Sequence, residues 1–185
     1  MGKKTGTVVK SSVVASFLRK EAEKKGCVKP SAVLADNLIY GKNQTGNPTK
    51  GVEILRIAYD KGDLLAITIM GELYYNGYPH KKFIIPNPEK GLSCFCRAHA
   101  AGVPRATLGY AQALIKGKGC SQDIPEAQRL LESITEKEPL AKVSVALLYK
   151  EGRIGQDKSA IERHDIVMKL LCEAITKDCP QAHTQ

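Results

Sequence analysis

The sequence contains no tryptophan, and only 5% of its 185 residues are aromatic. Proteins that bind single-stranded nucleic acid by stacking need several exposed aromatic rings, so this class is disfavoured. No run of eighteen apolar residues occurs, which excludes a membrane-spanning helix of the usual length. With 43% hydrophobic and 25% charged residues, the composition is that of an ordinary folded protein.

Common catalytic motifs are missing as well. The sequence holds no G-x-S-x-G, no G-x(4)-G-K-[ST], no H-E-x-x-H and no S-x-x-K. The four histidines, His80, His99, His164 and His183, have spacings that make neither a catalytic triad nor a metal-binding set, so we interpret them as surface residues. We therefore expect no enzymatic activity, no metal site and no cofactor.

Six cysteines are present, at positions 27, 94, 96, 120, 172 and 179. Cys94, Cys96 and His99 read C-x-C-x-x-H, whereas zinc sites favour C-x(2–4)-C with a second, distant pair that is missing here. We interpret the cysteines as structural thiols in a reducing compartment. Residues 1–9 lack the apolar stretch of a secretory signal, so we expect an intracellular, cytoplasmic protein, with a processed periplasmic or secreted form as the alternative.

Positive charge is concentrated at the N-terminal end. The net charge is +9, and residues 1–29 hold eight lysines and arginines against two glutamates, a surplus of six. We expect residues 1–11 to form a basic, flexible segment. Binding of nucleic acid or of an anionic surface through this end is an alternative function, but no motif that reads bases is present, so we expect no specific nucleic acid as a partner.

A pattern of small and large residues recurs along the chain at intervals of 36, 40, 36 and 40 residues. Its members stand at offsets 0, 3, 7 and 11, which is the spacing of one helical face, and the first three copies end in glycine. We call this pattern helix B. Its five copies start at Ala15, Gly51, Gly91, Ala127 and Val167.

A second pattern, which we call helix A, lies between these copies at offsets 0, 4, 5, 8 and 11. Small residues at offsets 0 and 5 let another backbone approach closely, and large residues at offsets 4 and 8 fill the space beside them. The copies start at Ala66, Ala106 and Ala141, with a degenerate copy at Ala32.

Capping signals support the same helices. Asn47-Pro48, Asn87-Pro88 and Asp123-Ile124-Pro125 each place a capping side chain just before a proline suited to the first helical turn. Each A and B pair is then an antiparallel hairpin that needs its neighbour to cover its apolar face. We predict an all-α fold, a right-handed α-solenoid of antiparallel helix hairpins.

Two segments resemble the Sel-1-like repeat (SLR) family. Residues 117–127, GKGCSQDIPEA, are similar to its G-x-G-V-x-x-D-x-x-x-A connector, with Cys120 in place of valine. Residues 66–77 read A-x(3)-M-G-x(2)-Y-x(2)-G, which resembles its A-x(3)-L-G-x(2)-Y-x(2)-G pattern. The resemblance covers residues 12–182 and implies a single tetratricopeptide-like α-solenoid domain.

The resemblance also sets the expected boundaries. We expect a helix B half repeat over about residues 12–26, repeats over about 31–62, 64–102, 104–138 and 139–178, and an incomplete last helix over 179–185. The last B helix then lacks a full cover, although the end of a solenoid needs a cap. We therefore expect either self-association through this uncapped C-terminal end or further sequence downstream.

The resemblance implies a non-enzymatic protein–protein interaction scaffold or adaptor. A cysteine-rich branch of the family carries a disulfide in each repeat, at positions that correspond here to Ile175 and His183. Because neither residue is a cysteine, an enzyme of that branch is the least favoured alternative.

In such arrays the A helices line the concave side, and the helical offsets not used for packing face the groove. The predicted partner-binding residues are Glu72, Tyr75, Asn76, Arg105, Leu108, Gln112, Ile115, Lys116, Val143, Leu147, Lys150 and Glu151. An apolar strip with basic edges suits a peptide or protein with apolar anchors and acidic flanks. The alternative is that the apolar members pack against neighbouring helices and only the charged members contact water.

Overall fold

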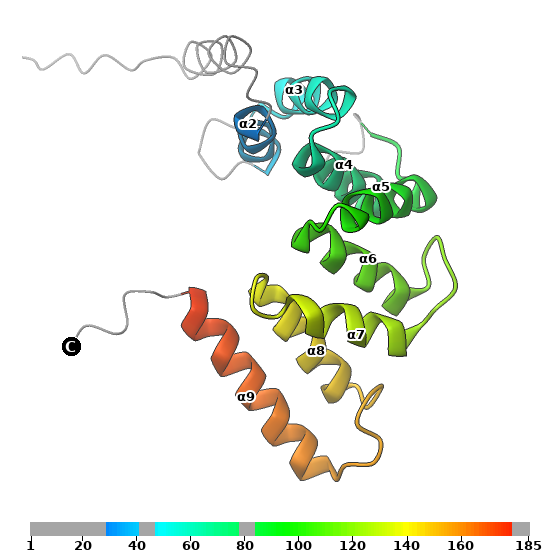
Figure 1. Cartoon of the computed structure of the whole chain (residues 1–185), viewed down its shortest axis with the longest axis vertical. Helices are drawn as coiled ribbons and strands as arrows, with labels where there is room; N and C mark the ends of the chain where they lie inside the picture. The colour runs from blue at the N-terminus through cyan, green and yellow to red at the C-terminus, as the bar shows by residue number, and fades with distance from the viewer. Residues whose placement is uncertain (1–28, 41–46, 78–83, 179–185) are drawn as a thin grey trace, which may run out of the picture. The chain divides into compact units, whose positions relative to one another are not determined.

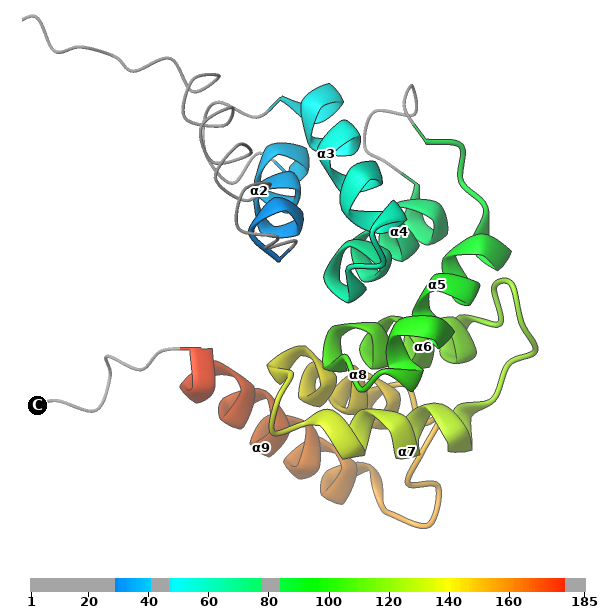
Figure 2. The ribbon, with the colours of Figure 1, turned by 45° about the horizontal axis from the view of Figure 1, so that its top comes forward.

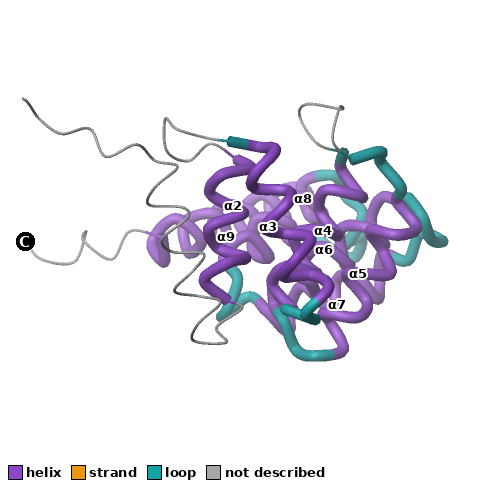
Figure 3. Tube along the Cα trace, turned by 90° about the horizontal axis from the view of Figure 1, so that it is seen from above, coloured by secondary structure: helices purple, strands orange, loops and turns teal. Residues whose placement is uncertain are grey.

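The structure is a computed structural model, and it describes residues 29–40, 47–77 and 84–178. Within these ranges the chain is all-α and contains no strand, as Figures 1 and 3 show, so the predicted fold class is confirmed. The expected basic segment 1–11, the first B helix (12–26) and the incomplete helix over 179–185 lie outside the described residues.

The described helices belong to two compact units, residues 1–70 and residues 71–185, and the boundary between the units lies inside α4. In the first unit α2 packs against α3, and in the second each of α5 to α8 packs against the next helix in the chain. In chain order the helices are α2 (Lys29–Tyr40), α3 (Pro48–Asp60), α4 (Leu64–Asn76), α5 (Pro88–Ala100), α6 (Pro104–Lys116), α7 (Ile124–Ile134), α8 (Pro139–Lys150) and α9 (Ala160–Asp178).

The predicted helix starts are confirmed. The side chains of Asn47, Asn87 and Asp123 accept hydrogen bonds from backbone N–H groups three residues later, at 3.1, 2.9 and 3.0 Å. A proline stands in the first turn of each of these helices. Helix ends agree too, because Gly102 (φ 78°) and Gly117 (φ 62°) adopt the left-handed conformation that glycine tolerates without strain.

The predicted small residues of the A helices lie in the interior. In α6 and α8 the positions at offsets 0 and 5 are at most 1% exposed. Their residues are Ala106, Ala111, Ala141 and Ala146. Small side chains at these points let the flanking helices approach closely, which is the packing that the repeat pattern predicts.

One interior position of the B helices does not belong to the predicted pattern. At offset 4 stand Leu55, Phe95 and Leu131, which are at most 1% exposed and are among the largest fully buried side chains of the described chain. In the second unit the Phe95 ring lies beside two glycines. A β-carbon added at Gly71 would lie 2.9 Å from the ring, and one added at Gly109 would lie 2.7 Å from it.

The last described helix, α9, begins seven residues before the first position of its B copy, Val167, whereas α3, α5 and α7 begin three residues before theirs. The segment from Gly152 to His164 has the composition of a connector, but α9 starts at Ala160. Ser159 and Glu162 explain this start: the Ser159 hydroxyl accepts from the Glu162 N–H at 3.2 Å, and the Glu162 carboxylate accepts from the Ser159 N–H at 2.7 Å. This reciprocal capping box stabilises the first turn of a helix.

A buried lysine holds the C-terminal hairpin of α8 and α9 together. The Lys142 side chain is 7% exposed, and its Nζ lies 2.7 Å from Glu173 Oε2 on α9 and 3.7 Å from Glu136 Oε1 in the turn before α8. The hydrogen bond to Glu173 raises the pKa of Lys142, and it lowers the pKa of the Glu173 carboxyl. The two helices run antiparallel side by side in Figures 1 and 2.

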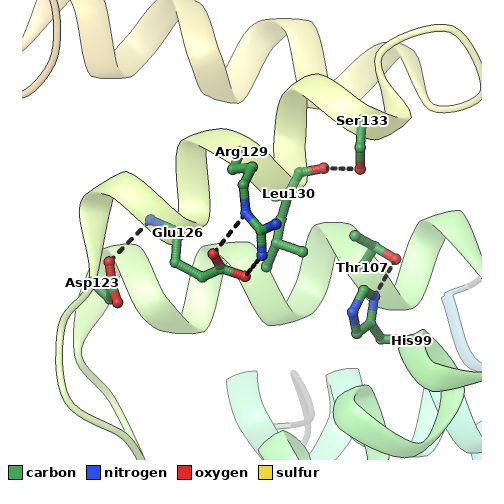
Figure 4. A network of polar contacts seen from close by, with 7 residues as sticks. All are labelled: His99, Thr107, Asp123, Glu126, Arg129, Leu130 and Ser133. Atoms are coloured by element: carbon green, nitrogen blue, oxygen red, sulfur yellow. Dashed lines mark hydrogen bonds and ion pairs between the residues drawn. The ribbon is translucent and has the colours of Figure 1, made fainter.

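The interpretation of all four histidines as surface residues is wrong for His99. This side chain is half-buried, its Nδ1 lies 2.9 Å from Thr107 Oγ1, and its ring centroid lies 5.6 Å from that of Tyr110. Figure 4 shows His99 directed towards Thr107, near the exposed Glu126–Arg129 pair of α7. The His99–Thr107 bond therefore joins α5 to α6.

We predict that Gly109→Ala destabilises the protein. At an open helical position this change stabilises by about 1 kcal/mol, but here the added methyl group overlaps the Phe95 ring, and overpacking costs about 1–3 kcal/mol. Urea unfolding followed by circular dichroism measures the change. The loss of stability caused by Gly109→Ala should be smaller in a Phe95→Leu background than in the wild type. A raised unfolding midpoint for Gly109→Ala alone would contradict this packing.

We predict that the Lys142–Glu173 pair stabilises the fold in a pH-dependent way. Because the folded-state pKa of Glu173 is lowered from its usual 4.5, the contribution is present above pH 4.5 and is lost as the pH falls through the lowered folded pKa. The free energy of unfolding should therefore differ between the wild type and Glu173→Gln at neutral pH, and the difference should shrink in acid. An equal difference at both pH values would show that the pair contributes nothing.

Candidate functional site

The predicted partner-binding residues all lie in the second unit, on α4, on α6, and on α8 and the residue after it. Helices α6 and α8 contact each other, although a B helix separates them in the sequence. Between them lies a cavity of about 330 Å³. It is lined by Gln112, Ile115, Lys116, Ser144, Leu147, Leu148, Glu151 and Arg153, five of which are in the predicted set.

The cavity combines an apolar surface with a charged rim. Leu147 is 48% exposed, a high value for a leucine, and Leu148 beneath it is 1% exposed. Ile115 is half-buried and packs against the core. Lys116 and Glu151 stand exposed at the edge. An apolar side chain of a ligand could therefore be covered here while its neighbours meet charged groups.

Arg153 lines the cavity and is not in the predicted set. Its Nη2 donates to the carbonyl oxygen of Ile115 at 2.8 Å, and its Nη1 lies 3.6 Å from Glu151 Oε2. Gln122 donates to the same carbonyl oxygen at 2.8 Å. These bonds fix the loop after α8 against the end of α6, which gives the cavity a defined wall.

Ser144 is a second lining residue that the sequence analysis missed, although a signal for it exists. It stands seven residues before Glu151, which is in the predicted set. Seven residues along a helix bring a side chain back to within about 20° of the same direction. A wider sector of the helical face would have included it.

Basic side chains gather at the C-terminal end of α6. Lys118 Nζ donates to the carbonyl oxygen of Tyr75 at 2.8 Å and lies 5.1 Å from the centre of its ring. Lys116 Nζ lies 6.0 Å from the same ring centre. Carbonyl oxygens at the end of a helix carry partial negative charge, so lysines are stabilised there. This end therefore presents positive charge beside the cavity.

Two residues predicted to face the groove lie in the core instead. Tyr75 is 3% exposed, with its ring centroid 5.8 Å from that of Phe95, and Leu108 is 7% exposed within the apolar cluster between α6, α7 and α8. Burial and, to a smaller extent, the Cys120 thiol raise the pKa of Tyr75, so its phenol stays neutral. The alternative that apolar members pack against neighbouring helices is correct for these two.

Two further predicted residues bind each other. Arg105 on α6 donates to both carboxylate oxygens of Glu72 on α4, with Nε–Oε1 and Nη2–Oε2 distances of 2.6 Å. The side chains are 34% and 20% exposed. A bidentate pair of this kind fixes both groups, so they position the helices.

The remaining predicted residues are dispersed. Asn76 is exposed at the end of α4, and Val143 is half-buried on α8. Lys150 lines a different cavity, of about 380 Å³, between α8 and α9. The predicted set thus divides into a convergent group at the α6–α8 cavity and residues that serve the core or other surfaces.

Four cysteines fall within the described ranges, and they are free thiols in different surroundings. Cys94 is buried, Cys96 and Cys120 are half-buried, and Cys172 is exposed. Burial and then the Cys120 thiol raise the pKa of Cys96, which keeps this thiol protonated. In the described part of the chain, no three His, Cys, Asp or Glu side chains are grouped so as to hold a metal ion. The same part has no helix with the length and apolar character required to cross a membrane.

We predict that Arg105→Glu lowers stability by about 1 kcal/mol, because it removes the pair and places two carboxylates together. The reversed pair, Glu72→Arg with Arg105→Glu, should restore most of the loss. Urea unfolding measures both changes. The matched control is Arg129→Glu, which disrupts the exposed Glu126–Arg129 pair within α7 and should have the smaller effect. A reversed pair no more stable than Arg105→Glu would contradict the role of this contact.

No family model and no curated protein matches the sequence. The solved structures that resemble the fold include two repeat proteins. One is a Sel1 repeat protein from Oxalobacter formigenes, with a TM-score of 0.66 and 15% identity, over 88% of this chain and 63% of that chain. The other is a protective antigen present in uropathogenic Escherichia coli strains and displaying an SLR fold, with a TM-score of 0.63 and 19% identity, over 95% of this chain and 35% of that chain. The chain thus spans less than two thirds of either protein, and it has the repeat fold of Sel1 repeat proteins.

Proposed function

We propose that the protein is a non-enzymatic scaffold that binds a peptide segment of another protein at the cavity between α6 and α8. The observation that carries this proposal is the convergence there of an exposed leucine, Leu147, with the charged residues Lys116, Glu151 and Arg153. The cavity joins two consecutive A helices, which is where a solenoid of this type would offer a continuous surface to a ligand.

The size of the cavity favours one anchoring side chain of a larger ligand. Its volume of about 330 Å³ is at the low end of the range for small-molecule sites, about 300–1,000 Å³. Its apolar surface comes from Leu147 and Ile115 at the cavity and Leu148 below. A leucine, isoleucine or methionine from a partner would cover Leu147, and the contact would remove apolar area of both chains from water.

Charge at the cavity indicates what should flank that anchor. Lys116 is exposed on one side, with Lys118 close to it at the end of α6. Glu151 is exposed as well, but Arg153 lies 3.6 Å from it and offsets its charge. An aspartate or glutamate next to the anchor would therefore meet a net positive rim, which favours binding and accelerates encounter.

The test is selection of peptides from a random library on the wild-type protein. We predict a consensus with one large aliphatic residue and an acidic residue close to it. Leu147→Asp should weaken binding of the selected peptides by about tenfold or more, since it places a charge in the anchor site. Lys116→Glu should weaken binding of those peptides that have acidic flanks. Arg105 is unsuitable for this test, because it does not line the cavity and we predict that its substitution lowers stability.

Leu140→Asp provides a matched control. Leu140 is 56% exposed on the same helix, α8, and does not line the cavity. The Leu140→Asp variant should bind the selected peptides with the same affinity as the wild type. Peptides that bind Leu147→Asp and the wild type equally would refute the site, and a consensus of basic peptides would refute the charge argument.

A further inference from the structure

The last described helix carries a row of exposed apolar side chains. Ile161, Met168 and Ile175 of α9 are 76%, 49% and 67% exposed. They are seven residues apart and therefore stand above one another on one side of the helix. Val167 and Ala174, which pack inward, are 8% and 6% exposed. The helix is thus apolar on two sides, of which its own unit covers one.

The row borders a hollow surface. Among the described helices α9 packs against α8, as Figures 1 and 2 show. The cavity of about 380 Å³ between these helices is lined on the α9 side partly by His164, Met168 and Leu171, and on the α8 side by Tyr149 and Lys150. An apolar row beside an apolar cavity forms one continuous surface for another helix.

We propose that this surface binds α9 of a second copy of the chain, in antiparallel orientation, about a two-fold axis at Met168. A two-fold interface uses the same patch on both copies, so the patch must complement itself. This row does so: reversal about Met168 places Ile161 of one copy opposite Ile175 of the second copy, and Met168 opposite Met168. A methionine at the axis suits a self-contact, because its flexible side chain adapts to its equivalent.

The charges beside the row favour the antiparallel arrangement. Asp165 and Lys169 are exposed on the same flank of the row, four residues apart. Reversal about Met168 keeps this flank on the same side in both copies and brings Lys169 of one copy within about 3 Å, along the helix axis, of Asp165 of the second copy. The symmetry repeats this opposite-charge contact. In a parallel pairing, the flank of one copy that carries Asp165 and Lys169 would face the opposite flank of the second copy, which carries His164 and Leu171. The contact between Lys169 and Asp165 would then be absent.

The proposed dimer leaves the α6–α8 cavity outside its contact residues, so the two proposals can fail separately. One helical row on each copy makes a small interface, below the roughly 1,000 Å² of area that a stable specific complex buries. Association should therefore be reversible and depend on concentration. Sedimentation velocity or light scattering over a range of concentrations measures it, whereas peptide binding measures the cavity.

Met168→Glu is the first variant to measure. It places two carboxylates at the axis and should weaken the dimer by at least about tenfold in dissociation constant, with an unchanged circular dichroism spectrum because Met168 is exposed. Ile85→Glu is the matched control, since Ile85 is 84% exposed and precedes α5, which among the described helices does not pack against α9. A wild type that stays monomeric, or a Met168→Glu variant that dimerises as the wild type does, would overturn the proposal.

Cysteine crosslinking tests the orientation, in a Cys172→Ser background that removes the exposed thiol of α9. Met168→Cys should form a disulfide-linked dimer by itself. Ile161→Cys should form little dimer alone but should crosslink when mixed with Ile175→Cys. Efficient self-crosslinking of Ile161→Cys would indicate parallel helices and overturn the antiparallel geometry.

Charge exchange tests the flank. Asp165→Lys alone and Lys169→Asp alone should each weaken the dimer, because each places like charges together, and the double variant should restore it. A double variant as weak as the single variants would remove the charge argument for this orientation.

Discussion

Close approach between neighbouring helices is the constraint on which the second unit depends. The Phe95 ring occupies the space that β-carbons at Gly71 and Gly109 would need, and a β-carbon at Gly91 would lie 2.8 Å from the backbone nitrogen of Tyr75. Glycine is unfavourable inside a helix, but at these positions it lets neighbouring helices approach closely enough to enclose the Phe95 ring. The position of α6, and through it of the α6–α8 cavity, follows from this packing.

Polar contacts then fix what the packing leaves free. Apolar contacts are not directional, so they tolerate small rotations of one helix on another. The Glu72–Arg105 pair, the Lys142–Glu173 pair and the bond from Arg153 to the Ile115 carbonyl each join segments that are more than thirty residues apart. The bond from Arg153 joins the loop after α8 to the end of α6 and so fixes part of the lining of the α6–α8 cavity. The other two pairs position α4 against α6 and α8 against α9.

Sequence reasoning succeeded where the controlling interaction is local. Helix starts at Asn47, Asn87 and Asp123, and the glycine at the end of α6, depend on neighbours within a few residues. The early start of α9 could also have been predicted, because Ser159 and Glu162 have the spacing of a capping box. The period of small residues identified the inward faces of the A helices, because each copy repeats the same requirement for close packing.

The candidate site was less predictable, and the reason is geometric. The spacing of residues along a helix indicates which side chains share a face. It does not indicate how much of that face a neighbouring helix covers. Tyr75 and Leu108 lie in the predicted sector and are nevertheless enclosed. The Arg105–Glu72 pair joins α6 to α4, which α5 separates in the sequence, so no local spacing reveals the pair.

The enclosure of Phe95 has a consequence for how such a protein can change. The equivalent positions one repeat later hold Leu131 in place of the ring, and Ala111 and Ser144 in place of the two glycines. A smaller central side chain thus coincides with larger flanking ones, so the sizes of residues from adjoining helices are matched across these two junctions. Duplicating, deleting or transplanting a single repeat would therefore place side chains of unmatched size against each other where it meets its neighbours. Such rearrangements should fold stably only when the contacting residues of both adjoining repeats change together.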